Sequence, residues 1–176
     1  MRERRLALVL LFPFCVLTLF SVSGDESKEL LESKMCGPYS LSIAAERIGI
    51  KLDPIKIARI AGVGKSGVSM RRLADAAYQM GLEATGRKLS LAELVKLKPP
   101  IIILIRRNSS KPNHFLVMDQ VIGDSLRLID PPGIVYLISK EEFAKIWSGY
   151  ALVLSKQGAF LTFKDEPDIH VLDPHS

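Results

Sequence analysis

The chain has 176 residues, of which 24% are charged and 48% hydrophobic, and its formal net charge is +5. This length suits one compact domain with a substantial core and little else. Three arginines and one glutamate at positions 2–5 account for a net +2 of the charge. The remaining basic residues are scattered, and aromatic residues do not alternate with them, so no nucleic-acid partner is expected.

Residues 1–23 have the parts of a secretion signal. A basic head precedes an apolar run from Leu6 to Phe20, and the small residues Ser21-Val22-Ser23 offer a cleavage site before Gly24. The run is short for a membrane span, which needs about 20 residues. A cleaved signal and an uncleaved anchor that associates with a membrane through residues 6–22 both remain open. Either one predicts an exported or membrane-anchored protein of the bacterial extracytoplasmic type.

The region before residue 100 is dominated by helical periodicity. Four helices are predicted, each with a start signal that satisfies or removes unpaired N–H groups. They begin near Pro38, at Asp53-Pro54, after Ser69 and with the capping box Ser90–Glu93. Gly62 and Gly81 end the second and third helices, and Lys98-Pro99-Pro100 ends the fourth.

After Pro100 the pattern changes to strands, with one more helix between Ser139 and Trp147. The strands are predicted at Ile101–Ile105, Phe115–Val121, Leu126–Ile129, Val135–Ile138 and Tyr150–Leu154. Helices followed by strands predict an α+β fold, a helical N-terminal half packed against a mainly antiparallel sheet. Residues 24–155 form the predicted domain, and residues 156–176 form a polar C-terminal tail.

Cys36 is the one thiol expected in the mature chain, because Cys15 lies inside the export signal. A single thiol is explained by burial, by pairing between molecules or by chemistry. The segment Cys36-Gly37-Pro38 places it at the start of a helix, where unpaired N–H groups and the helix dipole favour the thiolate. When such a cysteine is considered alone, it is more often a small buried core residue than a nucleophile.

Two other residues fit a cysteine nucleophile. His114 is the one histidine in the predicted core, and Asp130 ends the strand that pairs with the strand of His114. With a turn at residues 123–124, antiparallel pairing brings residues near 116 opposite those near 130, which puts Asp130 within reach of His114. An ordinary edge histidine and a turn-opening aspartate are the alternatives. Together, the three residues predict a Cys–His–Asp system in which imidazole moves the proton.

The order of several motifs also resembles that of a known family. The motifs are Met35-Cys36-Gly37-Pro38, Gly67-Val68-Ser69, Met80-Gly81-Leu82, Pro100, His114-Phe115-Leu116-Val117, Ile129-Asp130-Pro131, and Phe143 with Trp147-Ser148-Gly149. Over about residues 33–155 they are similar to the bacteriocin-processing cysteine peptidases, papain-like domains that cut leader peptides after a double glycine. The resemblance implies a peptide or protein substrate and no cofactor. It implies that Cys36 is the nucleophile, that His114 is the general base and acid, and that Asp130 orients His114.

The chain departs from that family at the oxyanion donor. The family carries a glutamine a few residues before the cysteine, whereas residues 24–35 contain none and Leu30 stands six residues before Cys36. Loss of one such donor costs about 10²–10³ in turnover. The resemblance therefore implies a peptidase of weakened activity, and a non-hydrolytic peptide-binding domain on the same fold is the alternative.

Three further segments have patterns that resemble binding sites. Gly62–Ser66 lacks the glycine that a phosphate-binding loop requires at position 59 and follows a helix. Metal binding by Asp168, His170, Asp173 and His175 of the tail is poorly supported, and no metal is expected. The basic segment Arg106–Lys111 precedes His114 and either favours acidic substrates or is a solvated loop.

Overall fold

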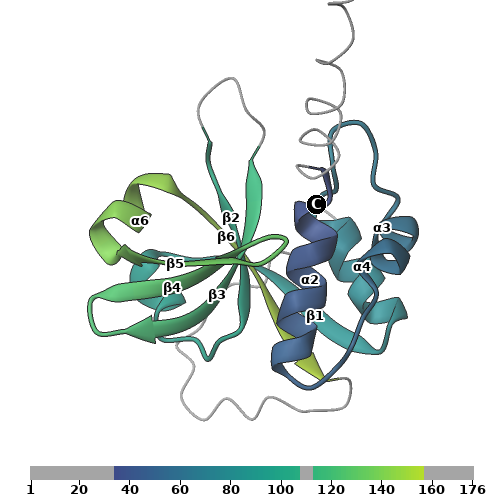
Figure 1. Cartoon of the computed structure of the whole chain (residues 1–176). Helices are drawn as coiled ribbons and strands as arrows, with labels where there is room; N and C mark the ends of the chain where they lie inside the picture. Colours follow the sequence, from purple (N-terminus) through teal and green to yellow (C-terminus); the bar gives the residue numbers. More distant parts are fainter. Residues whose placement is uncertain (1–33, 108–112, 157–176) are drawn as a thin grey trace, which may run out of the picture.

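Helices cover both faces of a six-stranded antiparallel sheet (Figure 1). The computed structural model describes residues 34–107 and 113–156. The predicted signal, Leu30 and residues 157–176 of the tail lie outside them. The strand order is β1-β6-β2-β3-β4-β5. The elements are α2 Cys36–Arg47, α3 Pro54–Ala61, α4 Met70–Gln79, β1 Leu82–Lys88, α5 Leu91–Leu94, β2 Ile101–Ile105, β3 His114–Ile122, β4 Ser125–Asp130, β5 Ile134–Ser139, α6 Lys140–Ile146 and β6 Trp147–Lys156. The α+β prediction is confirmed.

The predicted helix starts are present. The side chains of Asp53, Ser69 and Ser90 accept bonds from backbone N–H groups at the starts of α3, α4 and α5, and Ser139 does so for α6. Such caps satisfy donors that the first helical turn leaves unpaired. The prediction that the fourth helix continues to Lys98 was wrong, because α5 has only four residues. The capping box fixes where that helix starts but not how far it runs.

Strand β1 was missed by sequence reasoning, which assigned helical periodicity to the whole region before residue 100. Its sequence, LEATGRK, has a single fully buried residue, Leu82, and most of the others are exposed. It pairs along its full length with β6 at the edge of the sheet. An edge strand of this composition lacks the apolar alternation by which strands are recognised, so its pairing with β6 comes from the tertiary structure.

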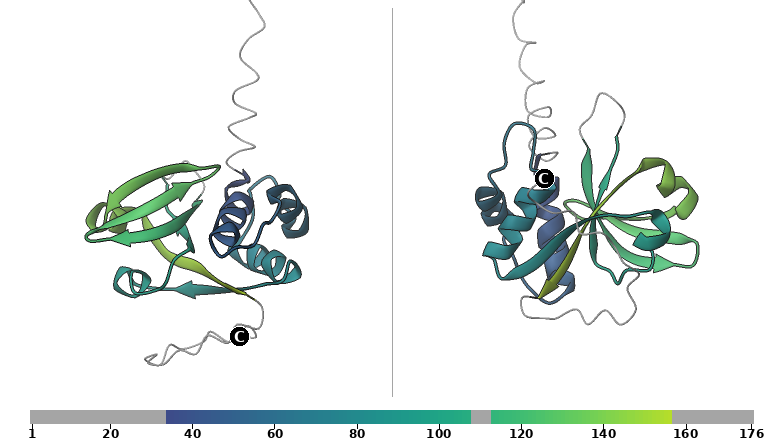
Figure 2. Two further views of the ribbon diagram at one scale, coloured as in Figure 1. Left: turned by 60° about the horizontal axis from the view of Figure 1, so that its bottom comes forward. Right: turned by 180° about the vertical axis from the view of Figure 1, so that it is seen from behind.

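The sheet separates two apolar cores. Figure 2 shows the helices that lie on its two sides. The first core lies beneath α2, α3 and α4 and includes Leu41, Leu73 and Val117. The second lies on the opposite face, where Phe143 of α6 and Leu94 of α5 pack against the strands. Side chains that alternate along a strand point to opposite faces. For this reason Ile101–Ile105 is apolar at every position and is buried between the two cores.

An ion-pair network ties the C-terminal end of α2 to the sheet. Arg47 Nε lies 2.8 Å from Asp119 Oδ1, and Arg127 Nη1 bonds Asp119 Oδ2. The Asp119 side chain is 8% exposed, so its charge is compensated by two guanidinium groups rather than by water. Since Asp119 lies on β3 and Arg127 on β4, the network fixes α2 against the strands that carry His114 and Asp130.

No helix among the described residues is long and apolar enough to cross a membrane. The predicted signal or anchor lies outside these residues, so its cleavage or retention stays a prediction, as do the boundaries at residues 23 and 155.

Candidate active site

Cys36 is the first residue of α2 and is 6% exposed. Its position at the helix start follows from Gly37 and Pro38, since proline needs no hydrogen-bond acceptor in the first turn. The backbone N–H groups of Phe115 and Gly37 donate to its sulfur, and the His114 side chain is a third hydrogen-bond partner. Among the described residues it is a free cysteine. The thiol is therefore surrounded by donors suited to a thiolate.

His114 and Asp130 meet at the end of the sheet nearest Cys36. His114 Nε2 lies 2.7 Å from Asp130 Oδ1, so the first residue of β3 contacts the last residue of β4. The pairing Ile122↔Ser125 agrees with a turn at residues 123–124, and a one-residue register shift between Met118 and Gln120 then gives Val117↔Ile129. Since Nε2 is occupied by Asp130, Nδ1 is left for the thiol. The structure thus brings all three predicted residues into one chain of contacts.

Two opposing influences set the pKa of the Cys36 thiol. Burial is the largest and raises the pKa, because it disfavours the charged form. The hydrogen bond and positive charge of His114, with the N–H groups of Phe115 and Gly37, together outweigh burial and hold the pKa below its usual value. The geometry therefore favours the nucleophilic form of the sulfur.

His114 shows the complementary effect. Burial is again the largest influence and lowers the pKa of the ring, but the bonds to Asp130 and Cys36 outweigh it and raise the pKa above its usual value. The charged ring is thus retained to higher pH than in an ordinary histidine and is lost as the pH rises through the raised pKa. A lowered thiol pKa beside a raised imidazole pKa favours a thiolate–imidazolium pair.

Gly37 is required by close packing at the site. A Cβ atom added there would lie 2.5 Å from Val68 Cγ1 and 3.3 Å from Phe115 Cδ2. Val68 precedes the Ser69 cap of α4, so the side chain that fills this space comes from a separate helix connection. The start of α2 can approach β3 closely because residue 37 has no side chain.

We expect Gly37→Ala to lower the free energy of unfolding by about 1–3 kcal/mol, because the added methyl group overpacks this contact. Alkylation of Cys36 should also become slower near neutral pH, since the thiol moves relative to His114. Urea unfolding and iodoacetamide labelling measure the two effects. Adding Val68→Ala to Gly37→Ala should restore much of both, with Val68→Ala alone as the baseline. If the double variant is no better than Gly37→Ala, Val68 is not the obstacle.

Two side chains near His114 and Asp130 do not belong to the predicted triad. Tyr136 of β5 lies close enough to Asp130 for the carboxylate to raise its pKa, although burial contributes more to that rise. The charge of Arg107 lowers the pKa values of both His114 and Tyr136. Sequence reasoning identified the basic segment of Arg107 but missed Tyr136, which carries no motif and is found only through strand pairing.

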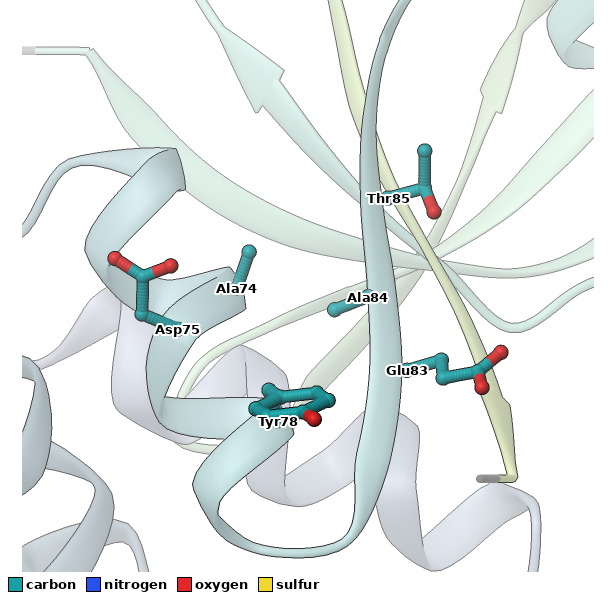
Figure 3. A pocket seen from close by; sticks show the side chains of 6 residues that line it. All are labelled: Ala74, Asp75, Tyr78, Glu83, Ala84 and Thr85. Carbon is teal, nitrogen blue, oxygen red and sulfur yellow. The ribbon is translucent and has the colours of Figure 1, made fainter. Parts of the chain in front are cut away.

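One described pocket lies elsewhere, between α4 and β1 (Figure 3). Its volume is about 340 Å³, and its lining includes Asp75, Tyr78 and Glu83. The Asp75 and Glu83 carboxylates point away from each other, so they do not converge on a ligand. In the described ranges no cluster of three or more His, Cys, Asp or Glu residues could hold a metal ion. The candidate metal ligands of the tail lie outside these ranges.

Residues 30–159 match the sequence profile of the Peptidase C39 family. This is most of the chain. The chain belongs to the peptidase C39 family. Membership agrees with the resemblance found in the sequence and with the papain-like arrangement of α2 against β3 and β4.

Solved structures of the family share its fold. The peptidase domain of Streptococcus ComA, a bifunctional transporter involved in quorum sensing, is 25% identical with a TM-score of 0.64. The comparison covers 70% of this chain and 93% of that domain. A double-glycine-motif protease from an AMS/PCAT transporter, solved with its leader peptide, is 26% identical with a TM-score of 0.64. That comparison covers 72% of this chain and 88% of the protease.

Among curated relatives, the probable functional amyloid protease FapD of Pseudomonas aeruginosa is 28% identical over 141 residues. The match covers 80% of this chain and 59% of FapD. The colicin V secretion/processing ATP-binding protein of Escherichia coli is 28% identical over 121 residues, but the match covers only 17% of its length. The activities of these longer proteins are therefore not assigned to this chain by similarity alone.

Proposed function

We propose that the chain is a cysteine peptidase that hydrolyses peptide bonds with Cys36, His114 and Asp130. The observation that carries the proposal is the contact chain from the Cys36 thiol through His114 to Asp130, with a lowered thiol pKa at one end. Membership of a peptidase family supports the reaction class, and the geometry supports the role that we propose for each residue.

In the proposed reaction the Cys36 thiolate attacks the carbonyl carbon of the scissile bond and forms a tetrahedral intermediate. The His114 imidazolium then donates its proton to the departing amine, which leaves an acyl-enzyme thioester. Next, His114 takes a proton from water as the water attacks the thioester, and the acid product and the thiolate are released. Asp130 holds the ring in position through Nε2 and stabilises its positive charge.

One donor for the oxyanion comes from the described part of the chain. The backbone N–H of Cys36 belongs to the first turn of α2, where helices leave N–H groups without an intrahelical acceptor. Leu30, at the expected position of the second donor, lies outside the described residues and cannot donate from its side chain. Low turnover is the consequence we propose, since one missing donor costs about 10²–10³.

The second candidate function is a non-hydrolytic peptide-binding domain, and Leu30 is the observation that favours it. Such a domain would retain the fold without the rate acceleration. We favour the peptidase because a binder has no need of a thiol held by three hydrogen-bond partners. The segment at residues 1–23 further supports the proposal that the chain acts outside the cytoplasm, by export or anchoring.

The test compares the full chain with Cys36→Ala and Cys36→Ser. Fluorogenic peptides with a double glycine before the cut are incubated with each protein, and an electrophilic peptide probe is used to label the thiol. The peptidase proposal expects slow cleavage and site-specific labelling in the wild type alone. Binding of peptides without cleavage or labelling would establish the non-hydrolytic function instead.

A further inference from the structure

Arg107 is placed beside the site by the last residues of β2. Ile105, which ends that strand, pairs with His114, and Arg107 follows two residues later. Arg107 therefore lies just past the end of the strand, beside the residue that pairs with His114. The Arg106 N–H donates to the Ile146 carbonyl at 2.8 Å, which holds the backbone just before Arg107.

Tyr136 reaches the same place from the other edge of the site. It pairs with Leu128 across β4 and β5, and Asp130 follows Leu128 by two residues on the same face. Its half-buried ring is therefore a diagonal neighbour of Asp130. Burial and Asp130 both raise its pKa, so the phenol keeps its proton at neutral pH and can donate it in a hydrogen bond.

In the described part of the chain, no carboxylate forms an ion pair with the guanidinium of Arg107. Its charge lowers the pKa values of both His114 and Tyr136, in keeping with its place two residues after Ile105, which pairs with His114. The adjacent acid, Asp130, bonds His114. A cation is thus present at the site without a fixed partner in the described part of the chain.

The proposed mechanism indicates which part of a peptide substrate lies near Arg107. His114 donates a proton to the departing amine, so the nitrogen of the first residue after the scissile bond must come within reach of His114. Arg107 follows the end of β2 and Tyr136 lies on β5, in the sheet that also carries His114 and Asp130, whereas Cys36 lies on α2. From this arrangement we infer that the cation lies nearer to the leaving segment than to the acyl segment.

We propose that Arg107, assisted by the Tyr136 hydroxyl, selects substrates with an Asp or Glu close after the cut. This inference rests on the proposed peptidase function and adds a substrate class to it. A guanidinium binds a carboxylate by charge-assisted hydrogen bonds, which are stronger than those between neutral groups. An amide of the same shape would lose the charge and accept fewer of these bonds, so the site distinguishes Asp from Asn.

The test uses pairs of double-glycine peptides that differ only by Asp or Asn at the first, second or third position after the cut. In the wild type we expect kcat/KM to be about tenfold higher for the Asp peptide at one of these positions. The preference should weaken as sodium chloride is added, because the contact is partly exposed. In Arg107→Gln the Asp-to-Asn ratio should fall to about twofold or less, and Arg107→Lys should keep an intermediate ratio.

Arg106→Gln is the matched control. It removes the same charge one residue away, from an exposed position whose charge does not act on His114 or Tyr136, and should keep the wild-type ratio. Tyr136→Phe should lower the ratio by less than Arg107→Gln does. Equal ratios in the wild type and Arg107→Gln, or an equal fall in Arg106→Gln, would overturn the proposed contact.

Binding of the same peptide pairs to Cys36→Ala, followed by fluorescence anisotropy, measures the preference without cleavage. Cleavage without any Asp preference defeats this inference alone. Preferential binding of the Asp peptide without cleavage by the wild type defeats the peptidase function and leaves the selectivity standing. Absence of both cleavage and binding defeats both.

Discussion

His114→Ala is expected to move the pH dependence of Cys36 alkylation to higher pH and to lower peptidase turnover by about 10²–10⁴, the usual contribution of a general acid–base group. The variant loses the hydrogen bond and the positive charge that most favour the thiolate. Burial, which raises the thiol pKa, then dominates. The rate of iodoacetamide modification is measured across the pH range, with peptide mapping to separate Cys36 from Cys15.

The unfolded chains provide the control for this comparison. In guanidinium chloride the wild type and His114→Ala should alkylate with the same pH dependence, because the folded contacts are gone. His114→Gln retains a hydrogen-bonding side chain without the titratable ring, so it should resemble His114→Ala in the pH profile. If the folded variants match the wild type, the thiol is not coupled to His114 and the proposed mechanism fails.

The raised pKa of His114 predicts the direction in which a substitution of Asp130 moves the pH profile of activity. Peptidase activity should be lost at low pH as Cys36 takes up its proton, and at high pH as the imidazolium loses its own. Asp130→Asn removes a hydrogen bond that favours the charged ring. The upper limb of the pH profile should therefore move to lower pH. An unchanged upper limb would show that a group other than Asp130 stabilises the charged ring of His114.

The sequence predicted the elements that have strong local signals. Apolar continuity located Ile101–Ile105, and capping residues located the starts of α3 to α6. The hairpin turn at residues 123–124 was sufficient to place Asp130 near His114, although a one-residue shift between Met118 and Gln120 changes the exact register. The principal contact of the candidate site therefore follows from local sequence signals.

Other features depend on contacts that no local pattern encodes. The N–H of Phe115 reaches the Cys36 thiol only because α2 packs against β3, and that approach needs the bare backbone of Gly37 against Val68. Strand β1 is defined by its partner β6 rather than by its own composition. For the same reason Tyr136 could not be assigned to the site from the sequence, since its neighbours belong to another strand.

The structure also explains how a buried thiol can be a nucleophile. Burial by itself would keep Cys36 protonated, as expected for a small core hydrophobe. Three hydrogen-bond partners from two different elements reverse that effect. Because the Arg47–Asp119–Arg127 network fixes the other end of α2, the orientation of the helix against β3 is set at both ends. The candidate site is therefore a product of the whole packing between α2 and the sheet.

Leu30→Gln is expected to raise turnover by about 10²–10³, the effect of restoring one oxyanion donor. Leucine cannot donate a hydrogen bond at the position where the family carries glutamine. The nearby acids Glu29 and Glu32 would oppose a developing negative charge if they are ionised. The measurement is kcat on a double-glycine peptide, with Cys36→Ala added to Leu30→Gln to show that the gain depends on the thiol.

Leu31→Gln is the matched control, since it makes the same chemical change one residue further along the chain. A gain confined to Leu30→Gln would place the missing donor at position 30. Equal turnover in both variants, with a loss in Ser33→Ala or Lys34→Ala, would show that the wild type already has a second donor in the segment just before Cys36. If neither leucine variant nor the wild type cleaves any peptide while all three bind, the departure at Leu30 marks a change of function from hydrolysis to binding.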